Sequence, residues 1–96
     1  MRDISGTVVA ITGASAGIGA ASARALAAEG ALLVLGARRT ERLKELATEL
    51  GENVAVVEMD VRNPGDSTRL VETAYNRFGR LDALVANAGI GAYGGI

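Results

Sequence analysis

The chain has 96 residues, of which 49% are hydrophobic and 22% charged, an ordinary balance for one small globular domain. Ten Lys and Arg against eleven Asp and Glu give a net charge of −1, which argues against nucleic acid as the main partner. Cys and His are both absent. Their absence excludes disulfides, thiol nucleophiles, imidazole bases and most zinc sites, so we expect no metal site.

The N-terminus and the apolar stretches bear on location. The segment Met1–Gly6 carries an acidic residue and does not resemble a signal peptide. The longest near-apolar stretch, Gly30–Ala37, is far too short to span a bilayer. The sequence therefore predicts a cytoplasmic protein with no membrane partner.

Short, unbroken apolar runs recur along the chain. Such runs are typical of strands that are buried on both faces, which indicates a parallel sheet covered on both sides. The predicted strands are Thr7–Ile11, Leu32–Leu35, Val54–Val57 and Ala83–Ala86.

Helical patterns lie between these strands, and each ends at a glycine. Repeated alternation of strand and helix predicts an α/β fold of βαβαβαβ order with right-handed crossovers. The third helix places Tyr75 among residues expected to face the core. The predicted helices are Ile18–Glu29, ended by Gly30; Glu41–Leu50, capped by Thr40 and ended by Gly51; and a third from Asn63-Pro64 to Phe78, ended by Gly79. Their predicted inner faces include Leu43, Leu46, Ala47 and Leu50 on the second, and Leu70, Val71, Ala74 and Phe78 on the third.

The turn after the first strand carries three glycines within seven residues. Gly13 permits a tight turn, Gly17 lets backbone approach a pyrophosphate, and Gly19 allows the helix to pack closely on the strand. The helix N-terminus supplies free N–H groups and a positive dipole end, and hydroxyls of Thr12 and Ser15 add donors. Glycines that merely turn the chain are the alternative. No Gly-Lys-Ser/Thr follows, so this is not a Walker A loop.

The spacing Thr-Gly-x-x-x-Gly-Ile-Gly resembles the cofactor loop of the short-chain dehydrogenase/reductase family, in its single-domain subgroup. The resemblance extends over the whole chain and implies a Rossmann-type sheet of strand order 3-2-1-4. It also implies that the loop holds the cofactor phosphates through Gly13, Ser15, Ala16, Gly17, Ile18 and Gly19.

The end of the second strand bears on which nicotinamide cofactor is bound. An acidic residue there would bind the ribose 2′-hydroxyl of NAD. Ala37 stands in that place and is followed by Arg38 and Arg39, which can pair with a 2′-phosphate. The sequence therefore favours NADP over NAD. Two solvated arginines at the start of a surface helix are the alternative.

Two further segments match the family pattern. The pair Asp60-Val61 follows the third strand, where the resemblance implies a border of the adenine and a carboxylate that accepts from its amino group. Asp60 could equally cap the following turn. Asn87, Ala88 and Gly89 follow the fourth strand. Asn87 is expected to brace strand backbones, while Ala88 and Gly89 admit the nicotinamide-side ribose; a simple turn is the alternative, and Ala86 departs from the family's usual Asn.

The catalytic residues of the family have no counterpart in these 96 residues. Family members use a Tyr, a Lys four residues later and a preceding Ser. Here Tyr75 is followed four positions on by Gly79, Tyr93 lies three residues from the last residue, and the only lysine is Lys44. We therefore predict no catalytic residue in this chain.

We expect residues 1–96 to be a partial, NADP-binding Rossmann domain. A fragment of a complete reductase, a short natural chain that binds without catalysis, and a site completed by another chain all fit. The fourth strand would then lie at an open edge, which predicts self-association through it. A non-catalytic nucleotide-binding or assembly module is the alternative function; Ala37 speaks against a Rossmann-type methyltransferase.

Overall fold

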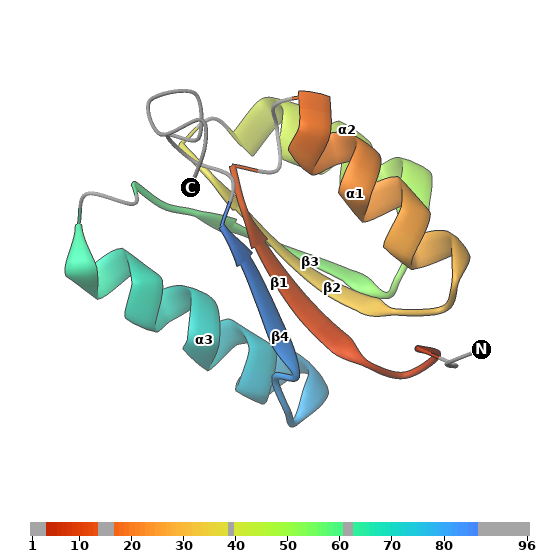
Figure 1. Cartoon of the computed structure of the whole chain (residues 1–96). Coiled ribbons are helices and arrows are strands. Elements are labelled where there is room, and N and C mark those ends of the chain that lie inside the picture. Colours follow the sequence, from red (N-terminus) through yellow and green to blue (C-terminus); the bar gives the residue numbers. More distant parts are fainter. Residues whose placement is uncertain (1–3, 14–16, 39, 61–62, 87–96) are drawn as a thin grey trace, which may run out of the picture.

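The computed structural model describes residues 4–13, 17–38, 40–60 and 63–86, in which strands and helices alternate (Figure 1). This confirms the predicted βαβαβαβ order. The elements are β1 (Val8–Thr12), α1 (Gly17–Ala28), β2 (Leu32–Ala37), α2 (Thr40–Leu50), β3 (Val54–Glu58), α3 (Pro64–Phe78) and β4 (Ala83–Ala86).

The four strands form one sheet in the order β3-β2-β1-β4, and every neighbouring pair is parallel. The predicted strand order is therefore confirmed. Parallel pairing brings the carboxyl ends of all the strands to one edge, which we call the carboxyl edge; the opposite edge is the amino edge. At the carboxyl edge Thr12 is paired with Gly36 on one side and with Ala86 on the other.

Helices cover both faces of the sheet. Figure 1 shows α1 and α2 on one face and α3 on the other. Successive strand residues point to opposite faces, so β1, β2 and β3 each contribute to two separate clusters. The buried cluster under α1 and α2 comprises Val9, Ile11, Ala23, Ala31, Leu33, Leu35, Ala37, Leu43, Leu46 and Val54. The buried cluster under α3 comprises Val8, Ala10, Val34, Val57, Met59, Leu70 and Ala74.

Element boundaries differ from the sequence predictions by one or two residues. β2 continues through Ala37 and β3 through Glu58, since these two residues are still paired across the ladder. β1 is shifted one residue forward and ends at Thr12. Thr40 is the first residue of α2 rather than the residue that precedes it.

The ends of α3 follow the prediction closely. Asn63 caps the helix by accepting a hydrogen bond from the Gly65 N–H at 3.0 Å, and Pro64 occupies the first position. Gly79 ends it in the left-handed conformation, with φ at 80°. The expected core position of Tyr75 was wrong, because its side chain is 54% exposed. On a helix it is rotated about 100° from its buried neighbour Ala74.

Within the described ranges, no helix has the length and apolar character needed to cross a membrane.

Candidate cofactor-binding site

The turn after β1 begins with a constrained glycine. Gly13 has φ at 68°, a conformation that residues with a side chain rarely adopt, and its N–H donates to the Gly36 carbonyl at 2.8 Å. The predicted tight turn at Gly13 is therefore present and is tied to the end of β2. Ser15 and Ala16 lie outside the described residues. The chain is described again from Gly17, where α1 begins at the carboxyl edge.

The start of α1 is placed as the glycine spacing predicted. Gly17, Ile18 and Gly19 form its first turn, and Gly19 is buried. The first turn of an α-helix has N–H groups that no helical carbonyl accepts, and the helix dipole is positive there. This turn therefore offers donors to an anionic group at the carboxyl edge.

A buried hydroxyl lies at the end of β1, at the same carboxyl edge. The Thr12 side chain is buried at the end of β1, and its Oγ1 has no hydrogen-bond partner among the described residues. A buried polar atom without a partner costs free energy, about 1–3 kcal/mol. A polar ligand at this edge would supply the missing hydrogen bond, so Thr12 fits a phosphate or ribose group seated beside the turn.

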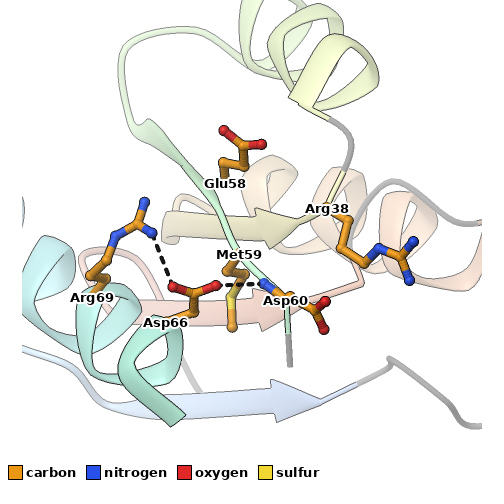
Figure 2. Close-up of a pocket in the computed structure, with 6 residues that line it drawn as sticks. All are labelled: Arg38, Glu58, Met59, Asp60, Asp66 and Arg69. Carbon is orange, nitrogen blue, oxygen red and sulfur yellow. Dashed lines mark hydrogen bonds and ion pairs between the residues drawn. The ribbon is translucent and has the colours of Figure 1, made fainter. Parts of the chain in front are cut away.

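A pocket of about 410 Å³ opens at the carboxyl edge between the end of β2, the end of β3 and the start of α3 (Figure 2). It is predominantly charged, which suits a polar ligand more than a hydrocarbon. Its lining residues are Arg38, Glu58, Met59, Asp60, Asp66 and Arg69.

Arg38 and Asp60, both predicted as cofactor-binding residues, line this same pocket. Arg38 is exposed and directly follows Ala37, the last residue of β2. Asp60 is half-buried and lies two residues beyond the end of β3. The sequence thus placed a cation and a carboxylate at neighbouring strand ends, and the fold brings them to one pocket. Arg39 and Val61 lie outside the described residues.

The remaining predicted residues follow β4. Asn87, Ala88 and Gly89 lie outside the described residues, directly after Ala86, which pairs with Thr12 at the carboxyl edge.

Sequence reasoning missed four members of the pocket, which are Glu58, Met59, Asp66 and Arg69. Two of them, Asp66 and Arg69, bond to each other. In the structure the Asp66 carboxylate accepts the Asp60 N–H at 2.9 Å and the Arg69 Nη1 at 3.1 Å. The three-residue spacing of Asp66 and Arg69 on a helix is a signal for their pairing, whereas nothing local indicates the bond to Asp60.

Comparison with known proteins identifies the family. The model of the short chain dehydrogenase family matches residues 7–96. The chain belongs to this family. The resemblance inferred from the glycine spacing and the strand-end residues is therefore confirmed.

Individual family members are similar in sequence and in fold. An uncharacterised oxidoreductase of Staphylococcus saprophyticus is 46% identical over 91 residues, which cover 94% of this chain and 37% of the relative. L-sorbose reductase from Gluconobacter frateurii, solved with NADPH and L-sorbose, is 45% identical with a TM-score of 0.84, covering 92% of this chain and 36% of that one.

A second similar structure was solved with the other nicotinamide cofactor. The 3-ketoacyl-(acyl-carrier-protein) reductase from Brucella melitensis, complexed with NADH, is 33% identical with a TM-score of 0.81. The matched region covers 84% of this chain and 33% of that one. The chain thus spans about a third of the length of these relatives.

Proposed function

We propose that this chain is the NADP(H)-binding portion of a short-chain dehydrogenase/reductase-type oxidoreductase that acts on a carbonyl or alcohol group. The observation that carries the proposal is the pocket shared by Arg38 and Asp60 at the carboxyl edge, the edge at which the Gly13 turn follows β1. The buried Oγ1 of Thr12, which has no partner in the part of the chain that the structure describes, supports a polar ligand at the same edge. The cofactor, when bound, supplies the hydride for such a reaction; the residues of this chain hold and orient it.

Each part of the edge has a separate task in this proposal. The first turn of α1 donates N–H groups to the pyrophosphate, and Gly19 keeps the helix close to the sheet. The Asp60 carboxylate accepts from the adenine amino group. Arg38 pairs with the 2′-phosphate, and Ala37 offers no carboxylate to repel it.

The preference for NADP over NAD rests on Arg38. Relatives of this family have been solved with either cofactor, so membership alone does not choose between them. A guanidinium that faces a phosphate forms charge-assisted, often bidentate hydrogen bonds, which a 2′-hydroxyl cannot reproduce.

We further propose that the 96 residues bind the cofactor without turning over substrate. The sequence contains no Tyr followed four residues later by Lys, and it has no His to serve as an alternative base. Asn87, Ala88 and Gly89 complete the binding edge in this proposal but supply no proton donor.

Calorimetric titration of the chain with NADPH and with NADH tests the proposed function. NADPH is expected to bind about tenfold more tightly than NADH, and Arg38→Ala to remove most of that difference. Arg77→Ala is the matched control, because Arg77 lies in the last turn of α3 and donates to the Glu52 carbonyl ahead of β3, at the amino edge. Failure of the wild-type chain to bind either cofactor would refute the proposal, and an unchanged preference in Arg38→Ala would remove Arg38 from the site.

We also propose that the isolated chain associates with a second copy of itself through β4. Among the described strands β4 pairs only with β1, and Leu84 is 56% exposed on it. An edge strand with unpaired N–H and C=O groups and an exposed apolar side chain is a template for further pairing. Sedimentation equilibrium should show dimers or larger species, and Leu84→Lys should shift them toward monomer; a clean wild-type monomer at high concentration would contradict this.

A further inference from the structure

The wall of the pocket contains a chain of two hydrogen bonds centred on Asp66. Its Oδ2 accepts the backbone N–H of Asp60 at 2.9 Å, and its Oδ1 accepts Nη1 of Arg69 at 3.1 Å (Figure 2). The Asp66 side chain is only 17% exposed, whereas that of Arg69 is 54% exposed. Asp66 is thus held between a loop amide and a helix side chain at the inner wall of the pocket.

The start of α3 explains why Asp66 reaches this amide. An acidic residue at the third helical position ordinarily bonds to the N–H of the capping residue. Here the N–H of the cap, Asn63, donates to the Asp60 carbonyl at 2.9 Å. The Asp66 carboxylate bonds instead to the N–H of Asp60, six residues before it.

Both backbone groups of Asp60 are therefore fixed by the beginning of α3. Its N–H is held by Asp66, and its C=O is held by Asn63. Fixing these two groups restricts the backbone dihedrals on either side of Cα and so sets the direction in which the side chain leaves the backbone. Figure 2 shows the Asp60 carboxylate directed away from Asp66, on the side of the pocket where Arg38 lies.

We infer that Asp66 is a positioning residue, held by Arg69, that aims the Asp60 carboxylate at the adenine amino group. The inference rests on the proposed function, since it assigns Asp66 to the pocket that is proposed to hold the adenosine part of the cofactor. Hydrogen bonds to an ionised acceptor are about twice as strong as neutral ones, so the carboxylate of Asp66 holds the amide firmly. Arg69 offsets the charge that a second carboxylate would otherwise place beside Asp60.

Selectivity for the adenine base shows whether Asp66 orients the Asp60 carboxylate or only stabilises the fold. In the hypoxanthine analogue of NADPH a carbonyl oxygen replaces the adenine amino group, so a carboxylate at Asp60 meets an acceptor instead of a donor. A site built to bond one donor typically discriminates strongly against an analogue that lacks it, here by about tenfold or more at a half-buried position. A variant that only loosens the fold weakens the binding of NADPH and of its analogue equally, so the ratio of the two dissociation constants does not change.

The test measures dissociation constants of NADPH and its hypoxanthine analogue for the wild-type chain, Asp66→Ala, Asp66→Asn and Arg69→Ala. Asp66→Ala is expected to reduce the ratio of about tenfold to about twofold. Asp66→Asn keeps an oxygen acceptor and should retain most of the ratio; Arg69→Ala should lie between. Glu72→Ala, an exposed position on the same helix that does not line the pocket, is the matched control and should retain the full ratio.

A double variant completes the design. If Asp66 acts through Asp60, adding Asp66→Ala to Asp60→Ala should not change the ratio further. If Asp66→Ala alone does not fold, the other two variants still test the inference. The inference requires Arg69→Ala to lower the ratio of dissociation constants more than Asp66→Asn does.

The outcomes separate this inference from the proposed function. A wild-type chain that binds neither cofactor refutes both. A wild-type chain that binds NADPH, with either no base preference or a preference that survives Asp66→Ala and Arg69→Ala, overturns the positioning role alone. A reduced ratio in Asp66→Ala, restored by Asn, supports it.

Discussion

The two edges of the sheet use the same arrangement of side chains for different purposes. At the amino edge, Oδ2 of Asp82 accepts the Val8 N–H at 2.8 Å while Oδ1 accepts Nη2 of Arg80 at 2.7 Å. At the carboxyl edge, Asp66 binds the Asp60 N–H and Arg69 in the same way. Each carboxylate joins a backbone amide from elsewhere in the fold to an arginine close to it in sequence.

What differs is the amide that each carboxylate holds. Val8 is the first residue of β1, and its carbonyl also accepts the Asp82 N–H at 2.9 Å, so Asp82 extends the pairing of β4 with β1. Asp60 lies beyond the end of β3 and lines the pocket. This carboxylate–arginine arrangement thus extends strand pairing at one edge and holds the backbone of a pocket-lining residue at the other.

The largest expected effect comes from loosening the helix that carries Asp66. Leu70 is 1% exposed and packs α3 against the sheet. Leu70→Ala should lower the free energy of unfolding by about 2–5 kcal/mol, measured by urea denaturation. Val71→Ala, at a half-buried position on the same helix, should cost less. A loss for Leu70→Ala no larger than that for Val71→Ala would show that α3 is not anchored to the sheet in this way.

A smaller loss of stability is expected from a substitution at Gly36, near the end of β2. A Cβ at Gly36 would collide with Sδ of Met59 and lie 3.1 Å from Cδ1 of Leu70. Gly36→Ala should therefore cost roughly 1–3 kcal/mol of stability and displace Met59, which lines the pocket. Gly65→Ala is the matched control, because among the described residues its Cβ would meet only Oδ1 of Asn63, at 3.4 Å. Equal stability of the two variants would contradict the expectation.

Some features that the sequence predicted well depend on residues close together in the chain, and others follow from the alternation of strands and helices. The cap at Asn63 and the left-handed Gly79 follow from local backbone chemistry. The strand order follows from the family resemblance together with unbroken apolar runs. The meeting of Arg38 and Asp60 in one pocket follows from parallel pairing, which brings strand ends to one edge.

The features that were missed depend on tertiary geometry. The bond from Asp66 to the Asp60 N–H requires the angle at which α3 leaves the loop, and no pattern in the sequence encodes that angle. Tyr75 adjoins Ala74, and only the rotation of α3 on the sheet decides that the alanine is buried and the tyrosine exposed. β3 extends to Glu58 because ladder pairing continues after the apolar run has ended.

The loss of folding stability at low pH tests the role of the Asp82 carboxylate at the amino edge. The Arg80 guanidinium and, next, the Val8 N–H hold the pKa of Asp82 below its ordinary value of 3.8. A lowered native pKa contributes stability above the unfolded pKa, and this contribution is lost as the pH falls through the native pKa. Asp82→Asn should therefore flatten part of the stability loss between about pH 5 and pH 2, measured by urea unfolding across that range. A variant with the same acid dependence as the wild type would show that the Asp82 charge does not stabilise the fold.

The smallest effect is expected from a third carboxylate–arginine pair, which holds no backbone amide of the described residues. Arg24 on α1 donates to both carboxylate oxygens of Glu49 on α2, at 2.8 and 3.2 Å, and both side chains are about half exposed. The Arg24 hydrogen bond lowers the pKa of Glu49, yet solvent and salt screen an exposed pair and side-chain entropy opposes it. Glu49→Gln should shift the urea midpoint less than Asp82→Asn does at neutral pH, and high salt should remove the shift. Both substitutions remove one charge and leave an amide oxygen that can still accept a hydrogen bond. An equal shift would mean that the arginine contact alone sets the effect. A larger shift for Asp82→Asn would mean that the bond from the Val8 N–H to the charged carboxylate adds to it.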